Sequence, residues 1–73
     1  MLRYVVLVTK YIGHRTYGIG LVQCEDGYPV LIETYADLSN RRIAVANLVR
    51  SCNRKHLDPL HLRDVVQDFI ESH

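Results

Sequence analysis

A tight-turn signal in the first half of the chain constrains the fold more than any other feature. Asp26-Gly27 separates two segments that are rich in β-branched and aromatic residues. An Asp-Gly pair favours the type I′ turn, because both central residues of that turn must adopt positive φ. The sequence therefore predicts an antiparallel hairpin that joins residues 15–24 to residues 28–35.

A further strand is expected ahead of this hairpin. Residues 2–12 are dominated by Val, Tyr, Thr and Leu, which suit a pleated, half-buried surface, and Gly13-His14 after them is typical of a tight turn. Within residues 15–24 the side chains alternate between two faces. One face receives Tyr17, Ile19 and Leu21, and the other receives Gly18, Gly20 and Val22. The first half thus predicts a three-stranded antiparallel meander.

The second half of the chain has helical patterns. Ser39 is a favoured N-cap, and residues 40–56 follow it without glycine or proline. Asp58-Pro59 begins a second helix, because Asp caps well and Pro is tolerated at the first helical position. The expected buried stripes contain Leu38, Val45, Leu48, Val49, Cys52 and His56 on the first helix and Leu62, Val65, Val66, Phe69 and Ile70 on the second. Residues 1–73 are therefore expected to form a single α+β domain of order βββαα.

Size and composition narrow the class of protein. A chain of 73 residues with 48% hydrophobic residues has enough apolar surface for one small core. No apolar run approaches the roughly 18 residues of a membrane span, and no cleavable signal is recognised. We expect a soluble cytoplasmic domain without a membrane partner, in which Cys24 and Cys52 are free thiols.

The helical half resembles a known family. The segments that carry the likeness are Asp37-Leu-Ser39, Val45-x-x-Leu48-Val49, Asn53-Arg54 and residues 57–70, with the run L-x-P-x-H-L-x-D-V-V-x-D-F as its most specific part. They are similar to a family of short uncharacterised bacterial proteins, a domain of unknown function with strands followed by two helices. The resemblance implies that fold and no activity. Arg41 and Arg42 depart from the acidic residues expected near the start of the first helix in such chains.

Charge is distributed unevenly along the two expected helices. Residues 37–57 carry a formal charge of +4 and residues 58–73 a charge of −3. Arginines in a first helical turn, beside free backbone amides, are typical of an anion site. The candidate contacts to an anion or partner are Arg41, Arg42, Arg50 and Arg54. A solvated basic face is the competing interpretation, because a net charge of +1 falls short of the balance typical of nucleic-acid modules.

Catalytic and metal-binding patterns are weak. Cys52 and His56 have i,i+4 spacing, but they share the expected core stripe, where Cys packs as a small hydrophobe. His61, Asp64 and Asp68 lie along one side of the second helix, and ligands from one helix do not close a metal site. The glycines of Gly18-x-Gly20 lie inside a strand rather than ahead of a helix, so they predict a bulge or a close approach of another element and no nucleotide site. We therefore expect no enzymatic activity and no cofactor.

The apolar and charged surfaces of the chain are the remaining candidates for its function. The first strand has apolar residues on both faces, and a chain this small gains from burying a second surface. The sequence is interpreted as a small non-enzymatic protein-interaction or regulatory module, a homodimer or the partner of a small protein, with Tyr11, Tyr35 and Ile43 as candidate self-association residues. The opposite charges of the two helices are a further candidate contact between copies. The alternative is a phosphate- or nucleic-acid-binding regulator that uses the basic face of the first helix.

Overall fold

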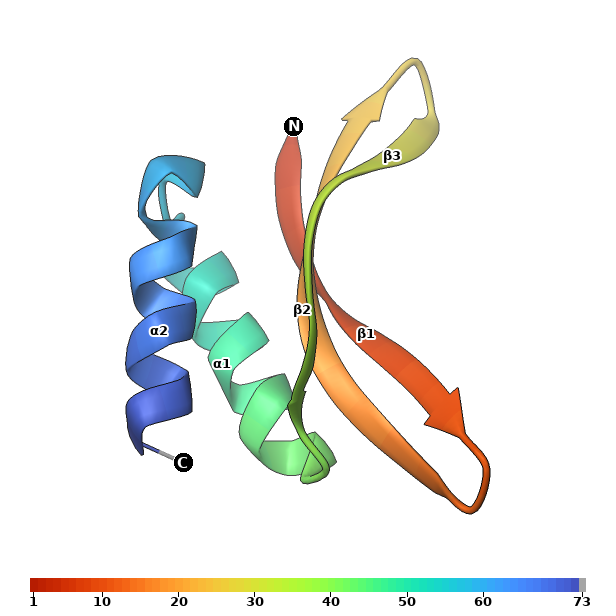
Figure 1. Cartoon of the computed structure of the whole chain (residues 1–73). Helices are drawn as coiled ribbons and strands as arrows, with labels where there is room; N and C mark the ends of the chain where they lie inside the picture. Colours follow the sequence, from red (N-terminus) through yellow and green to blue (C-terminus); the bar gives the residue numbers. More distant parts are fainter. Residues whose placement is uncertain (73) are drawn as a thin grey trace.

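Three antiparallel strands form one sheet with β2 in its centre, and two helices pack on one face of that sheet (Figure 1). The computed structural model describes residues 1–72. The elements are β1 (Leu2–Tyr11), β2 (His14–Glu25), β3 (Tyr28–Ser39), α1 (Arg42–Arg54), the 3-10 turn η1 (Pro59–His61) and α2 (Leu62–Ser72). The α+β fold predicted from the sequence, a meander followed by two helices, is confirmed.

The two hairpin turns differ. Asp26 and Gly27 have φ values of 52° and 82°, so both central residues occupy the left-handed region and the predicted type I′ turn is confirmed. The first turn was expected at Gly13-His14, and this was wrong by one residue. His14 already begins β2 opposite Tyr11, which leaves Ile12 and Gly13 as the loop. Only Gly13 of this loop has positive φ, at 87°.

The third strand is longer than predicted. It continues past Tyr35 to Ser39. The prediction was too short because two irregularities in the pairing of β3 with β2 disturb the alternation of side chains. One register shift separates the pair Leu21–Glu33 from the pair Val22–Leu31. The other lies between Ile19–Tyr35 and Tyr17–Ser39 and contains Asp37, whose φ is 58°. Bulges of this kind add residues to one strand, so a period of two no longer identifies it.

The start and end of α1 also differ from the prediction. Ser39 does not cap the helix, because its Oγ accepts a hydrogen bond from the Arg41 amide at 3.0 Å while the chain is still extended. Arg41 is the N-cap and makes no side-chain capping bond. At the other end, His56 lies beyond the helix with φ of 51° and is exposed. The expectation that His56 belongs to the buried stripe was wrong.

The start of the second helical segment is as predicted. The Asp58 carboxylate accepts a hydrogen bond from the Leu60 amide at 3.0 Å, and Pro59 is the first residue of the turn. That first turn is a 3-10 turn, and α2 follows directly from it. The Asp58 side chain supplies an acceptor to an amide that has no partner within the turn, and Pro59 has no amide that needs an acceptor. Together these two residues explain the boundary.

The core lies between the sheet and the two helices. The predicted alternation of β2 is confirmed, since Ile19 and Leu21 are 0% and 1% exposed. Both helices contribute to this core, whose buried residues are Tyr4, Ile19, Leu21, Val45, Val49, Cys52, Leu62, Val66 and Phe69. Ile70 was expected on the buried stripe of α2 but is half-exposed, because Val66 and Phe69 already fill the contact between α2 and the rest of the core.

Candidate functional site

The face of the sheet that the helices do not cover is apolar. Along β2, Gly20 and Val22 point away from the helices because they alternate with the buried Ile19 and Leu21. Their neighbours on the outer strands share this face. Val5 lies opposite Gly20 on β1, and Leu31 lies opposite Val22 on β3.

Two leucines from the outer strands meet above the central strand. A Cβ placed on Gly20 would lie 3.0 Å from Leu7 Cδ2 and 2.8 Å from Leu31 Cδ1. The absence of a side chain at Gly20 therefore lets the two leucines lean towards each other. We call Val5, Leu7, Val22 and Leu31 the open-face cluster. Both helices lie on the opposite side of the sheet (Figure 1). Leu31 remains 49% exposed, whereas Val22 is 8% exposed.

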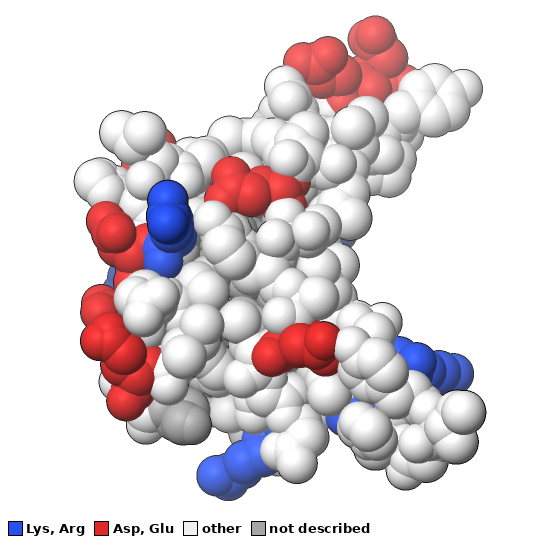
Figure 2. Space-filling view, in the orientation of Figure 1, with Lys and Arg blue, Asp and Glu red and all other residues white. Residues whose placement is uncertain are grey.

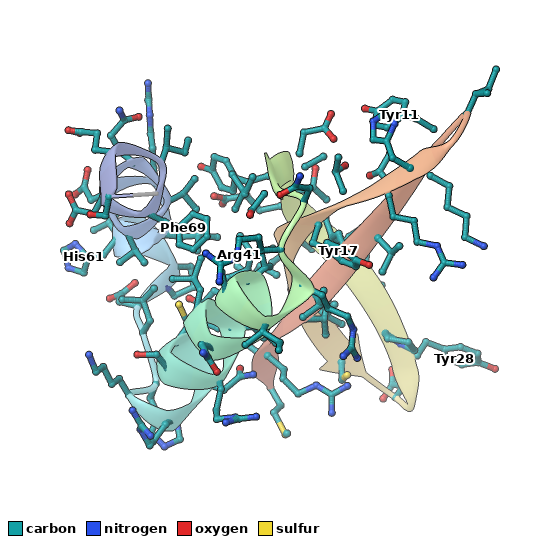
Figure 3. The ribbon with its side chains drawn as sticks, turned by 90° about the horizontal axis from the view of Figure 1, so that it is seen from below. Tyr11, Tyr17, Tyr28, Arg41, His61 and Phe69 are labelled. Carbon is teal, nitrogen blue, oxygen red and sulfur yellow. The ribbon has the colours of Figure 1, made fainter. Side chains whose placement is uncertain are left out.

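The two hairpins extend beyond the helices and enclose a recess over the open-face cluster. The space-filling surface is hollowed between the two hairpin ends (Figure 2). Tyr11 on one hairpin and Tyr28 on the other lie far from Phe69 and α2 (Figure 3). The hairpin ends carry exposed apolar side chains, among which Ile12 is fully exposed and Tyr28 is 76% exposed. These two side chains lie at opposite hairpin ends, and the open-face cluster lies between them.

The hairpin ends have opposite charges. Lys10 and Arg15 flank the loop between β1 and β2, whereas Glu25 and Asp26 lie at the turn between β2 and β3. Figure 2 shows acidic side chains at the end of one hairpin and basic side chains beside the other. The recess is thus bounded by an acidic end and by an end at which Lys10 and Arg15 outnumber the Asp37 carboxylate.

A polar cluster joins the three strands near the basic end. The Asp37 carboxylate, in the bulge of β3, accepts hydrogen bonds from the Tyr11 hydroxyl on β1 and the Thr16 hydroxyl on β2. The hydrogen bonds from Thr16 and Tyr11 lower the pKa of Asp37, and the bond to Asp37 raises the pKa of Tyr11. The Tyr11 ring also stacks on His14, with ring centroids 5.2 Å apart. The cluster holds the end of β3 against the first hairpin, and the sequence reasoning did not find it.

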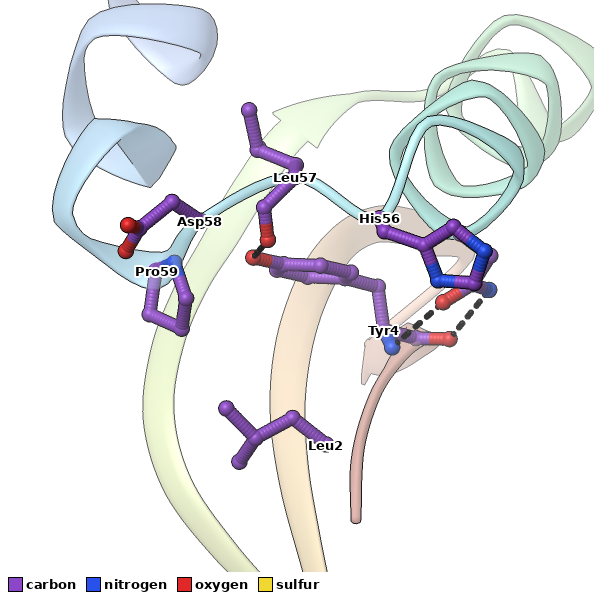
Figure 4. Close-up of a pocket in the computed structure, with 7 residues that line it drawn as sticks. Leu2, Tyr4, His56, Leu57, Asp58 and Pro59 are labelled. Atoms are coloured by element: carbon purple, nitrogen blue, oxygen red, sulfur yellow. Dashed lines mark hydrogen bonds between the residues drawn. The ribbon is translucent and has the colours of Figure 1, made fainter.

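A second feature missed by the sequence reasoning covers part of the edge of β1. The Asn53 side chain accepts a hydrogen bond from the Tyr4 amide at 2.8 Å and donates one to the Tyr4 carbonyl at 2.9 Å (Figure 4). The amide group thus pairs with the strand as a neighbouring strand would. The Tyr4 hydroxyl donates to the Leu57 carbonyl at 2.7 Å, which ties the segment after α1 to the same strand.

A pocket of about 300 Å³ adjoins this contact. It is lined by Leu2, Tyr4, Asn53, His56, Leu57, Asp58 and Pro59 (Figure 4). Its polar groups are largely engaged in hydrogen bonds that hold the chain together, namely those of Tyr4 and Asn53 and the Leu57 carbonyl. The other polar side chains of the lining are the exposed His56 imidazole and the Asp58 carboxylate, which accepts from the Leu60 amide.

The structure does not bring the three candidate self-association residues together. Tyr11 lies on the first hairpin, while Tyr35 pairs with Ile19 and packs against the core beneath the helices. Ile43 is 73% exposed on α1, away from the sheet. Tyr35 is partly buried because it pairs with Ile19. A regular alternation of side chains along β3 did not predict this pairing.

The four candidate arginines are all exposed on or beside α1. Arg41 is the N-cap of the helix (Figure 3). Arg42 is the first residue of the helix. Arg50 and Arg54 follow along the exposed side of the helix, and its first turn contains no acidic residue. These residues lie on the helical layer and not in the recess.

The candidate chemical pairs are separated or buried. Cys52 is 4% exposed, and its burial raises the pKa of the thiol, whereas His56 lies outside the helix. Within residues 1–72, no group of three or more His, Cys, Asp or Glu side chains has an arrangement suited to a metal ion. Gly18 has a structural role, because a Cβ there would lie 2.1 Å from the Tyr35 carbonyl oxygen. This close approach of β3 is one of the two readings that the glycine pair predicted.

Comparisons with known proteins give a family whose function is unknown. Residues 1–72 match the family described as "Family of unknown function (DUF6514)". No curated protein matches the chain, and no solved structure matches it. None of the helices within residues 1–72 is long and apolar enough to cross a membrane.

Proposed function

The chain belongs to this family of unknown function, as the resemblance in its helical half predicted. Because the family description names no function, we propose one from the geometry. The protein is a non-enzymatic interaction module that binds a protein partner through the open-face cluster. The observation that carries this proposal is the meeting of Leu7 and Leu31 above Gly20 on a sheet face that the helices leave uncovered. Leaving such surface in water is unfavourable by about 25 cal/mol for each Å² of apolar area.

The edges of the sheet are poorer contact surfaces than this face. On β1, the Asn53 side chain makes hydrogen bonds to the backbone amide and carbonyl of Tyr4, which are then not free to pair with another strand. Further along the same edge, Lys10 is a residue type that discourages strand pairing. On β3, Pro29 lacks an amide donor and the two register shifts interrupt a regular edge. Both edges therefore carry features that oppose sheet extension, and this supports binding through the face.

The reactive groups support a non-enzymatic role. The Cys52 thiol is buried with a raised pKa, so little of it is the nucleophilic thiolate near neutral pH. Asp37 is ionised and already accepts two hydrogen bonds, which leaves it poorly placed to act as a base. The pocket beside Tyr4 uses most of its polar groups within the chain.

Site-specific cross-linking in cells that produce the protein tests the proposal. A photo-cross-linking amino acid in place of Leu31 is expected to give a discrete protein adduct, which a Leu7→Glu substitution in the same chain removes. The matched control places the cross-linker at Gln67, an exposed position on α2, where we expect no adduct. Equal cross-linking at both positions, or none at either, would contradict the proposed contact surface.

A phosphate- or nucleic-acid-binding role for α1 is the second candidate function. It is favoured by the exposed Arg42, Arg50 and Arg54 and by a helix start without an acidic residue or a side-chain cap. A labelled oligonucleotide is expected to bind at about 50 mM salt with an affinity that falls steeply as salt is raised. The double variant Arg50→Glu/Arg54→Glu should lose this binding. Absence of binding by the unsubstituted protein at low salt would eliminate the role.

A further inference from the structure

We propose that the protein partner of the open-face cluster is a second copy of this chain. This inference rests on the proposed function and names its partner. Two copies related by a two-fold axis clasp each other, so that the β1–β2 hairpin of each copy lies in the recess of the other. Three observations carry the proposal: the apolar end of that hairpin, the opposite charges of the two hairpin ends, and the surface area of the chain.

The end of the β1–β2 hairpin is apolar where hairpin turns are ordinarily polar. Its loop begins with Ile12, which is fully exposed, whereas Gly, Asn, Asp and Ser dominate turns. Behind it, Tyr11 on the open face is 47% exposed, and Val8 on the opposite face of the hairpin is 53% exposed. These side chains match the apolar character of the open-face cluster, and inserting them between two hairpins would remove both surfaces from water.

The charges at the hairpin ends favour a two-fold arrangement of identical chains. A two-fold axis that crosses the strand direction reverses the second sheet relative to the first. The basic end of one copy, with Lys10 and Arg15, then lies beside the acidic end of the other, with Glu25 and Asp26. The symmetry repeats this contact, so a single chain supplies both halves of a self-complementary interface.

The chain exposes more surface than a compact monomer of its size. The accessible surface is 5423 Å², whereas a compact monomer of 8.5 kDa is expected to expose about 4,650 Å². The surplus is similar to the ~800 Å² that each partner buries in a standard protein interface. The radius of gyration of 12.2 Å also exceeds the ~11 Å expected for a compact chain of this length. The projecting hairpins account for this extended shape.

Analytical ultracentrifugation of the purified protein tests the apolar contact. The unsubstituted chain is expected to form a dimer that dissociates on dilution, and Ile12→Glu should weaken it at least tenfold. Because Ile12 is fully exposed in the single chain, this substitution leaves the fold intact. Ile43→Glu, an equally drastic change at an exposed position on α1, is the matched control and should leave the dissociation constant unchanged. If the control weakens the dimer and Ile12→Glu does not, the clasp is overturned.

A charge-exchange experiment tests the symmetry. One variant carries Lys10→Glu with Arg15→Glu, and the other carries Glu25→Lys with Asp26→Asn, in which asparagine tolerates the positive φ of the turn. Each variant alone places like charges at both contacts and should dimerise at least tenfold more weakly. Their mixture should form a heterodimer of nearly the original affinity, because each contact again joins opposite charges.

The outcomes separate this inference from the proposed function. If the unsubstituted chain is a monomer at all concentrations while the cross-linker at Leu31 captures a different protein, the clasp is wrong and the contact surface stands. A dimer that ignores the charge changes, with no rescue on mixing, also overturns the clasp. If position 31 gives no adduct of any kind, the proposed function fails together with this inference.

Discussion

The two faces of the sheet are built from the same kinds of residue but have different surroundings. On the helix-covered face, Ile19 and Leu21 are excluded from water by two helices. On the other face, Leu7 and Leu31 meet over a glycine, and Leu31 keeps half of its surface exposed. Apolar alternation shows which residues share a face, whereas burial depends on what the rest of the chain places against that face.

The largest expected effect breaks the covered face. Ile19→Ala removes a side chain with no exposed surface and leaves a cavity, so it should lower the free energy of unfolding by about 2–5 kcal/mol. Leu31→Ala, the counterpart on the open face, should cost less than about 1 kcal/mol. Urea denaturation at low protein concentration measures both without a contribution from self-association. Equal costs would show that the two faces are equivalently packed.

Two glycines sharpen the comparison within the open face. Gly18→Ala would place a Cβ 2.1 Å from the Tyr35 carbonyl oxygen, a backbone atom, so β3 must shift and the change should cost about 1–3 kcal/mol or more. Gly20→Ala meets side-chain atoms of Leu7 and Leu31 and no backbone atom among its nearest neighbours, so its cost should be smaller. Thermal unfolding ranks the two variants. A larger loss at Gly20 would contradict the described position of β3.

The edge contact between α1 and β1 should have an effect of intermediate size. Asn53→Ala removes both hydrogen bonds to the backbone of Tyr4 and should reduce the free energy of unfolding by about 1–3 kcal/mol. It also uncovers an unpaired stretch of strand, so the variant should aggregate faster on storage. Asn47→Ala, an exposed position on the same helix, serves as the control in denaturation and light-scattering measurements and should behave as the unsubstituted chain.

The smallest effect concerns the polar cluster on the first hairpin. Because hydrogen bonds from Thr16 and Tyr11 lower the pKa of Asp37 below 3.8, ionised Asp37 stabilises the fold above that pH. This contribution is lost as the pH falls through the lowered pKa. Asp37→Asn keeps a residue that tolerates positive φ and should be less stable at pH 7, with the deficit shrinking at an acidic pH below 3.8. A deficit of the same size at both pH values in urea denaturation would exclude the electrostatic cause.

Much of the fold could be predicted because its signals are local. The Asp26-Gly27 turn, the alternation of Ile19 and Leu21 and the cap at Asp58 each depend on neighbouring residues. The length of β3 could not be predicted in this way, because bulges at two places interrupt the two-residue alternation of its side chains. The start of α1 was misplaced for a related reason, because Ser39 bonds the Arg41 amide before the helix begins.

The candidate site was harder to predict because it is defined by distant residues. Tyr11 was singled out, but its partner Asp37 lies 26 residues away and meets it only through the sheet. Tyr35 was placed on a free surface although its pairing with Ile19 turns it towards the core. No pattern in a single sequence shows that a strand face lacks a covering element, so Leu7 and Leu31 were not recognised as a contact surface.

The pairing of Asn53 with Tyr4 has a consequence for the order in which the chain assembles. The two residues are 49 positions apart, so the Tyr4 amide acquires its acceptor only after α1 has docked on the meander. The turns at either end of β2, by contrast, close between adjacent strands. Slow hydrogen exchange at the Tyr4 amide therefore reports docking of the helix and not formation of the sheet. This single amide distinguishes a chain that has folded its hairpins from one that has completed its core.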